Sequence, residues 1–361
     1  MKKIVTVLGA RPQFIKAAML SREIREENDL QEIIVHTGQH YDTEMSEIFF
    51  REMDIPLPVY NLGVSGGAHG AMIGRMMIEL EPILLKEMPD LLLVYGDTNS
   101  TLAGAMVARK LNIPIAHVEA GLRNFDMSIP EDVNRILTDR ISNVLFCPTG
   151  VAVNNLKKEG FDSFPCTIVK TGDLMFDAVL HHAKLLPAKG YMPSIEKPKD
   201  YVLCTIHRAH NTETPGIFET FSALNQIAES EKIIFPIHPR TKKALDHHRI
   251  LLHPNIVSLV PQGYLDMVDL LKNSSCVITD SGGLQKEAYA LGKKSLLLMN
   301  YTPWEELVEN QFSVVTEIEK NTILQQWGKL QTLTPDYSKQ LYGNGHSSKV
   351  ILEEIKSFLN L

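Results

Sequence analysis

The sequence predicts an α/β fold built on two parallel sheets that are wound by helices. Short apolar runs of strand length alternate with longer segments of helical spacing, and each run stops abruptly at glycine or polar residues. This alternation is typical of βαβ units. It occurs twice, on either side of a stretch rich in proline and lysine at residues 181–200. With 361 residues, the chain is also long enough for two domains.

The predicted elements follow the same rhythm in both halves. The first half carries helices after Pro12, at about 71–87, at 99–110 and after Pro130, since proline suits a first helical turn. The second half ends in an amphipathic helix at 347–361. The expected strands are residues 4–8, 32–37, 91–95, 113–118, 143–147, 167–170, 201–206, 232–235, 256–259, 275–279 and 295–299.

Composition excludes several classes of protein. Lys plus Arg number 36 and Asp plus Glu 43, a formal net charge of −7, and a mildly acidic chain is a poor candidate for binding nucleic acid. No apolar run reaches the ~18 residues of a membrane span, and the N-terminal run predicts a first strand and not a signal peptide. The four cysteines lack metal-finger spacing, which is typical of buried thiols in a reducing compartment. We therefore expect a cytoplasmic enzyme.

Two predicted strands lead directly into charged residues. The strand at 91–95 is followed by Asp97, and the strand at 113–118 by Glu119. Ligands of open α/β sheets bind beyond the carboxyl ends of such strands. The polar side chains that we expect in one crevice there are Asp97, His117, Glu119 and Arg123.

Glu131 and Arg135 extend this charged group, because they follow at i and i+4 on one face of the next helix. A carboxylate among others of its kind has a raised pKa, as a general acid or base requires. Asp97 has a structural alternative, since a helix cap at the start of 99–110 would also explain it. Glu119 precedes no helix, so this alternative does not apply to it.

The clearest phosphate signal is the DSGG turn at 280–283. Glycines let backbone amides approach an anion, and the following helix adds its positive N-terminus. Ser281 offers a hydroxyl and Glu287 an acceptor for ribose, although a tight turn without a ligand would look the same. The dinucleotide and P-loop motifs are absent, so we expect a nucleotide sugar. Arg11 and Lys16, near the first helix, are further anion contacts or ordinary surface charges.

Three histidines, His40, His207 and His238, each follow a predicted strand. They lie far apart in the sequence, whereas a zinc site needs three or four ligands in a defined arrangement. We therefore expect no metal, and we interpret these histidines as hydrogen-bonded pocket residues.

Eight short motifs occur in order along nearly the whole chain. They are GARPQFIK at 9–16, TGQH at 37–40, GDTNSTLAGA at 96–105, HVEAGLR at 117–123, PEDVNR at 130–135, HR at 207–208, PIHP at 236–239 and DSGGLQKEA at 280–288. Together they resemble the non-hydrolysing UDP-N-acetylglucosamine 2-epimerase family. The resemblance implies two Rossmann-like domains facing across a cleft, the glycosyltransferase-B arrangement. The first domain would comprise 1–175 and a returning C-terminal helix at 346–361, followed by a crossing segment at 176–200 and a UDP-binding domain at 201–345.

The resemblance also implies the chemistry. UDP leaves C1 as the C2 proton is taken, which gives a 2-acetamidoglucal, and UDP adds back after C2 is protonated from the other face. No cofactor is needed. The implied catalytic residues are Asp97, Glu119, Glu131 and His207. The implied residues for UDP and phosphate are Arg11, Lys16, Arg135, Ser281, Gly282, Gly283, Glu287 and His238. A second, regulatory UDP-sugar site is implied at Gln39, His40, Arg75, Arg208 and His238.

The chain departs from the commonest family pattern at Trp304, where an arginine is usual, and at Ala10 and Gln13, where Thr and Glu are usual. This combination resembles the sub-family that converts UDP-2,3-diacetamido-2,3-dideoxyglucuronic acid to its manno epimer for surface polysaccharide such as lipopolysaccharide O-antigen. Trp304 then packs on the extra acetamido group or lies in the core. UDP-N-acetylglucosamine stays open as the substrate. A glycosyltransferase, a hydrolysing 2-epimerase and a non-catalytic sensor are the other candidates, and we expect a homodimer.

Overall fold

The computed structural model describes residues 1–39, 55–188 and 198–361, which form two compact units. Unit 1 contains Met1–Ala178 and Leu341–Leu361, and unit 2 contains Val179–Gln340. Each unit is built on one parallel sheet with helices, so the predicted α/β class is confirmed. The predicted domain boundaries stay a prediction. Within the described ranges, no helix is both long and apolar enough to cross a membrane.

The sheet of unit 1 has seven strands among the described residues, in the order β3-β2-β1-β4-β5-β6-β7. The strands are β1 (Lys2–Leu8), β2 (Leu30–His36), β3 (Tyr60–Asn61), β4 (Leu91–Tyr95), β5 (Ile115–Val118), β6 (Val144–Cys147) and β7 (Thr167–Lys170). Only β3 lacks a counterpart in the sequence prediction, because two residues carry no periodic signal.

Helices lie along this sheet, and α3 and α4 share one apolar core with it. The helices are α1 (Arg11–Arg25), α3 (His69–Glu87), α4 (Asn99–Lys110), α5 (Pro130–Ile141), α6 (Gly150–Lys158), the 3₁₀ turn Phe161–Ser163, the start of α7 (Leu174–Ala188) and α15 (Ser347–Leu359). In the core, Val7 and Val94 of central strands meet Leu80 of α3. Gly104 lets α4 approach β1 closely, because a Cβ there would lie 3.3 Å from the Val7 side chain. This packing holds the strand ends in fixed positions.

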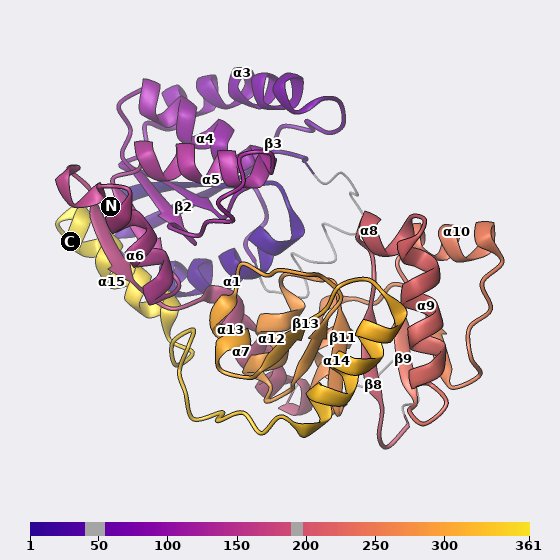
Figure 1. Ribbon diagram of the computed structural model, residues 1–361. Coiled ribbons are helices and arrows are strands. Elements are labelled where there is room, and N and C mark those ends of the chain that lie inside the picture. The colour runs from indigo at the N-terminus through magenta and orange to yellow at the C-terminus, as the bar shows by residue number, and fades with distance from the viewer. Residues whose placement is uncertain (40–54, 189–197) are drawn as a thin grey trace. The chain divides into compact units, whose positions relative to one another are not determined.

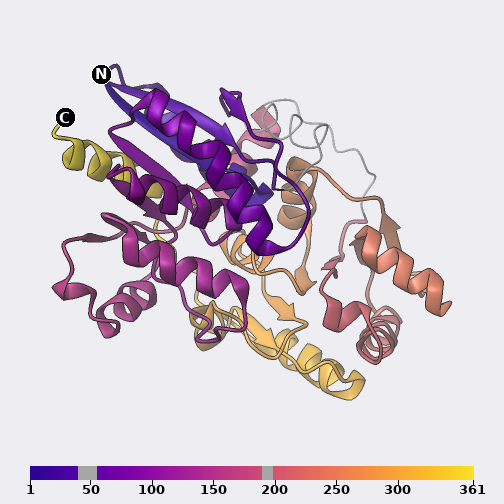
Figure 2. The same ribbon diagram turned by 90° about the horizontal axis from the view of Figure 1, so that it is seen from above.

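The C-terminal helix α15 belongs to unit 1, as predicted. It packs against α1, and Lys356 pairs with Glu27 at 2.7 Å. At its start, Asp177 accepts hydrogen bonds from the Ser347 hydroxyl at 2.9 Å and the Ser348 amide at 3.0 Å. Figures 1 and 2 both show the two chain ends side by side in this unit.

The sheet of unit 2 has six strands among the described residues, in the order β10-β9-β8-β11-β12-β13. They are β8 (Val202–Thr205), β9 (Ile233–Pro236), β10 (Ile256–Leu259), β11 (Cys276–Thr279), β12 (Ser295–Leu297) and β13 (Ser313–Val315). The helices are α8 (Ala209–Thr212), α9 (Gly216–Ile227), α10 (Pro239–His248), α11 (Tyr264–Asn273), α12 (Leu284–Ala290), α13 (Glu305–Glu309) and α14 (Lys320–Thr332).

Apolar cores lie on both faces of this second sheet. Phe221 of α9 and Ile323 of α14 pack on one face, and Leu271 of α11 and Ala288 of α12 on the other. Since both faces are covered, the strands are continuous apolar runs in the sequence. The four cysteines of the chain are free thiols.

Candidate functional site

Glu119 immediately follows β5 and has an unusual backbone. Its φ is +71°, in the left-handed region that residues other than glycine rarely adopt. The amides of Glu119 and Ala120 both donate to the carbonyl oxygen of Phe146, each at 3.0 Å, and hold the turn in this shape. Strained backbone of this kind is concentrated at functional sites.

The carboxylate of Glu119 forms an ion pair with the ammonium group of Lys16 from α1. The pair lies against Gly96, since a Cβ on Gly96 would be 3.4 Å from Glu119 Oε2 and 3.6 Å from Lys16 Nζ. Lys16 is buried, with 7% of its surface exposed. It is therefore no ordinary surface charge, and a buried ion pair that ends a strand is a candidate for chemistry.

Asp97 forms a second ion pair, with Arg135 of α5. The same guanidinium bonds to Asp132 at 2.9 Å. Helix α4 is capped by Thr98, whose hydroxyl accepts from the Thr101 amide at 3.3 Å. The helix-cap alternative for Asp97 is therefore wrong.

Glu131 does not join this arrangement in the way that its spacing suggested. It lies exposed in the first turn of α5, whereas Arg135 on the same helix is buried and bonds to Asp97 and Asp132. Asp132 is completely buried and also accepts a hydrogen bond from the Asn124 amide at 3.1 Å. We did not predict Asp132, although its spacing of i, i+3 from Arg135 was a usable signal.

His117 and Arg123 were expected in one crevice with Asp97, and the structure shows both buried in a hydrogen-bond network around Asp139. His117 Nδ1 lies 2.7 Å from Asp139 Oδ1, and Arg123 donates to Asp139 Oδ2 at 2.8 Å. Arg123 also forms two hydrogen bonds with Glu159, at 2.6 and 2.9 Å. Burial raises the pKa of Asp139, but His117 and Arg123 outweigh it and hold this pKa below its ordinary value.

Gln13 is another residue that the sequence reasoning did not place in the site. Its Oε1 accepts from the amides of Gly9 at 2.8 Å and Ala10 at 3.0 Å, and its Nε2 donates to the Tyr95 carbonyl at 2.8 Å. Gln13 thus joins the turn before Arg11, the first residue of α1, to the end of β4.

In unit 2, the buried carboxylate of Asp280 organises the strand ends. It accepts from the amides of His207 at 2.9 Å and Arg208 at 2.8 Å, and it lies 2.9 Å from His207 Nδ1. Burial opposes its ionisation, but the His207 contact and these amides lower the pKa of Asp280. The rings of His207 and His238 lie 5.9 Å apart. Burial, His207 and Arg240 lower the pKa of His238.

The turn after Asp280 carries Ser281, Gly282 and Gly283 and leads into α12. The Ser281 hydroxyl accepts from the Leu284 amide at 3.3 Å. Glu287 follows in the first turn of α12.

Trp304 contacts this turn through its indole group. Its indole N–H donates to the Gly282 carbonyl at 3.1 Å, and Lys286 Nζ lies 3.8 Å from its ring centroid. Only 5% of Trp304 is exposed. Its contacts favour the core interpretation over packing on a sugar.

The residues predicted for a regulatory site are divided between the units. In unit 1, Gln39 Oε1 accepts from the Ser100 amide at 3.0 Å, and Arg75 donates to the Gly66 carbonyl at 2.6 Å. Arg208 and His238 belong to unit 2. His40 lies outside the described residues.

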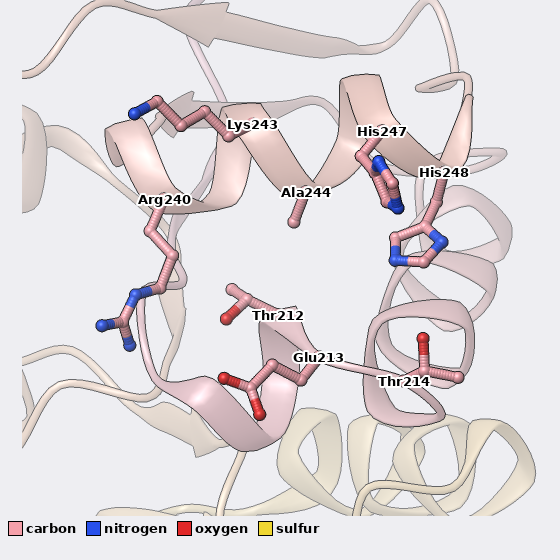
Figure 3. A pocket seen from close by; sticks show the side chains of 8 residues that line it. All are labelled: Thr212, Glu213, Thr214, Arg240, Lys243, Ala244, His247 and His248. Atoms are coloured by element: carbon pink, nitrogen blue, oxygen red, sulfur yellow. The ribbon is translucent and has the colours of Figure 1, made fainter.

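A hollow of about 600 Å³ in unit 2 contains none of the predicted site residues. Figure 3 shows side chains of α10 on one side of it and those of residues 212–214 on the other. Among residues 1–39, 55–188 and 198–361, no cluster of three or more His, Cys, Asp or Glu side chains could hold a metal ion.

The chain matches the family described as UDP-N-acetylglucosamine 2-epimerase over residues 22–356. It belongs to this family. The resemblance that the motifs indicated is thus confirmed, and the protein is an isomerase.

Two relatives and one solved structure cover nearly all of the epimerase. It is 48% identical to a UDP-N-acetylglucosamine 2-epimerase homolog of Methanococcus maripaludis, over 98% of this chain and 99% of that one. It is 46% identical to the UDP-2,3-diacetamido-2,3-dideoxy-D-glucuronate 2-epimerase of Pseudomonas aeruginosa, over 97% and 98%. The crystal structure of the Methanocaldococcus jannaschii UDP-GlcNAc 2-epimerase in complex with UDP-GlcNAc and UDP matches with a TM-score of 0.89 and 38% identity, over 99% and 100%. The glycosyltransferase-B class of the fold is confirmed by this match.

Proposed function

We propose that the protein epimerises C2 of a UDP-2-acetamido sugar by elimination and re-addition of UDP. The observation that carries this proposal is the ion pair of Lys16 with Glu119, on a strained strand end next to Gly96. The Asp97–Arg135 pair follows the neighbouring strand β4. Inversion at C2 needs proton transfer on both faces of the sugar, which suits two or more carboxylates better than one base.

The two steps balance without an oxidant or a cofactor. A base takes the C2 proton while the bond between C1 and the UDP oxygen breaks, and the electrons of the C–H bond form the C1=C2 double bond of a 2-acetamidoglucal. An acid then delivers a proton to the opposite face of C2, and the UDP oxygen re-forms its bond to C1. Asp97, Glu119 and Glu131 are the carboxylates that we assign to these proton transfers.

We assign the binding of UDP mainly to residues of unit 2. His207, oriented by Asp280, and the Ser281 turn stabilise the diphosphate as it leaves. Glu287 accepts from the ribose hydroxyls. The residues that complete the diphosphate contacts are Arg11, Lys16, Arg135, Gly282, Gly283 and His238.

For the sugar itself, we propose UDP-2,3-diacetamido-2,3-dideoxyglucuronate, converted to its manno epimer. Identity is 46% to the Pseudomonas aeruginosa enzyme with this substrate in its name, against 38% to the Methanocaldococcus jannaschii UDP-GlcNAc 2-epimerase. The combination of Trp304, Ala10 and Gln13, which resembles the sub-family acting on this sugar, also supports this choice. The second candidate is UDP-N-acetylglucosamine, which the Methanocaldococcus jannaschii structure contains.

An NMR assay in D₂O with both UDP-sugars tests the reaction and the substrate together. We expect deuterium at C2 of both epimers of the diacetamido substrate, and slower turnover of UDP-N-acetylglucosamine. Faster turnover of UDP-N-acetylglucosamine would reverse the choice of substrate. Absence of label from both sugars would refute the elimination mechanism, and stoichiometric UDP with free sugar would indicate the hydrolysing branch.

We also propose a cytoplasmic homodimer that binds a second UDP-sugar as activator at Gln39, His40, Arg75, Arg208 and His238. Sedimentation of the purified protein tests the dimer. Arg75→Ala tests the activator site, since it should flatten a sigmoidal dependence of rate on substrate. A hyperbolic dependence in the wild type would contradict this proposal.

A further inference from the structure

His117 is a buried histidine whose two ring nitrogens both face acceptors. Nδ1 lies 2.7 Å from Asp139 Oδ1, and Nε2 lies 2.7 Å from the carbonyl oxygen of Gly96. No surface of His117 is exposed. A neutral imidazole has one N–H and one bare nitrogen, so it can satisfy only one of two acceptors. A bare nitrogen against a carbonyl oxygen at this distance would be repulsive.

Asp139 faces His117 as an ionised acceptor. One carboxylate oxygen, Oδ1, lies against the ring, and the other, Oδ2, already accepts from two donors. Oδ2 accepts from the Gly121 amide at 3.1 Å and from Arg123 Nη1 at 2.8 Å. Donors on Oδ2 favour the ionised carboxylate of Asp139. The hydrogen-bond geometry is therefore complete only when His117 carries a proton on both nitrogens.

The charges around the ring alternate in sign and compensate one another. Glu159 pairs with Arg123, Arg123 with Asp139, and Asp139 with His117. Cys147 and Cys166 are the titratable neighbours of Asp139, and burial raises the pKa of both thiols, so they add no charge. With an imidazolium, the charges of Glu159, Arg123, Asp139 and His117 sum to zero, which avoids an uncompensated buried charge.

The network connects the two strand ends that carry the carboxylates. The amide of Gly96 donates to the Val118 carbonyl at 2.9 Å, and the carbonyl oxygen of Gly96 lies 2.7 Å from His117 Nε2. These two contacts fix the peptide group before Asp97. Gly121 bonds to Asp139 two residues after Glu119. We propose that His117 is an imidazolium that acts as a positioning residue, clamped by Asp139 to hold Asp97 and Glu119 in place. The positioning role rests on the proposed function, whereas the protonation state does not.

Ring ¹⁵N NMR of the ¹⁵N-histidine-labelled protein tests the protonation state directly, and the spectrum of His117→Gln identifies the signals of His117 among the 13 histidines. We expect both nitrogens of His117 to carry protons at pH 7. His36 is the internal control, because it is also buried in unit 1 but lies 3.4 Å from an amide oxygen of Asn61. Burial lowers the pKa of His36, so its ring should be neutral.

Kinetics test the positioning role. Asp139→Asn should lower kcat by up to about 100-fold, because a misplacement of about 1 Å from a mutation away from the chemistry can cost this much. KM should change little, because the UDP contacts of unit 2 are untouched. Asp177→Asn is the matched control, since it removes another buried carboxylate of unit 1, one that bonds Ser347 and Ser348 at the start of α15. It should lower the melting temperature and leave kcat unchanged.

A single-proton tautomer of His117 at pH 7 would overturn the inference whatever the activity. An imidazolium combined with unchanged kcat in both Asp139→Asn and His117→Gln would overturn the positioning role. If the wild type turns over neither UDP-sugar, the proposed function fails, and with it the positioning role, while the NMR signals still decide the protonation state. Should Asp139→Asn not fold, His117→Gln supplies the kinetic test.

Discussion

Lys16 and Glu119 form a buried ion pair although they lie 103 positions apart in the sequence and on different elements, α1 and the end of β5. The left-handed backbone of Glu119 directs its carboxylate to Lys16, and the pair lies against Gly96. Such a buried pair is costly to assemble, because both charges lose their hydration. The arrangement makes Glu119 the first residue to test.

Glu119→Gln should reduce kcat about 10²–10⁴-fold, the usual contribution of a general acid or base. The amide is nearly isosteric, so the fold should persist. The measurement is the rate of deuterium incorporation at C2 in D₂O.

Glu87→Gln is the matched control for that variant. Glu87 also pairs with a lysine of unit 1, Lys3 at 3.0 Å, but it belongs to α3 and has no assigned role in chemistry. It should keep the wild-type rate. Equal losses in the two variants would remove Glu119 from the proposed mechanism.

Asp97 and Thr98 are neighbours with separable roles. Thr98→Ala removes the cap of α4 and should lower the free energy of unfolding by about 0.5–2 kcal/mol with kcat retained. Asp97→Asn leaves the cap intact and should lower kcat by at least about tenfold. Urea denaturation and initial rates measure the two quantities. The assignment of Asp97 to chemistry fails if its variant loses stability and keeps its rate.

Trp304 supports the Gly282 carbonyl through its indole N–H. Trp304→Phe keeps an aromatic ring near Lys286 but removes this donor, which is worth about 0.5–1.5 kcal/mol. Because the proposed UDP contact is the turn itself, UDP should bind about 2–10-fold more weakly by calorimetry. Trp327→Phe, in the core around α14, should leave UDP binding unchanged. Weakening by both variants would indicate general destabilisation of unit 2.

Glu32 predicts an unusual pH dependence of stability. Its Oε1 accepts from the Thr6 hydroxyl, while Oε2 is buried with no hydrogen-bond partner among the described residues. Burial raises the pKa of Glu32, against the lowering effects of the Thr6 hydrogen bond and of the Arg25 charge. Near and above the ordinary pKa of Glu, about 4, the folded state therefore binds more protons than the unfolded state. The contribution of Glu32 to the free energy of unfolding consequently falls as pH rises above that value.

Glu32→Gln removes this titration and should be more stable than the wild type at neutral pH. Urea denaturation between pH 4 and 8 should show a shallower fall in stability for this variant than for the wild type. Glu319→Gln is a control of opposite sign, because hydrogen bonds from Thr322 and Asn321 lower the pKa of Glu319. A Glu32 variant that is less stable at every pH would show that the carboxylate is better satisfied than its contacts indicate.

Local patterns predicted the elements well, because strands covered on both faces must be apolar throughout and because proline and glycine mark their ends. The strand at 91–95 and the helix at 99–110 coincide with β4 and α4. The prediction of candidate residues was less complete. It included Lys16, Asp97 and Glu119, but it missed Asp132 and Asp139, whose importance comes from partners distant in the sequence.

The sequence by itself determined the parallel α/β class, the two-fold repetition of the fold and, through its motifs, the family. These properties depend on periodicity and on short segments, which are local. Only the tertiary structure decided that Thr98 and not Asp97 caps α4. It also decided that Arg135 pairs with Asp97, and that His117 lies between two acceptors. Each of these outcomes depends on which distant groups the packed sheet brings within hydrogen-bonding distance, and no local pattern encodes that.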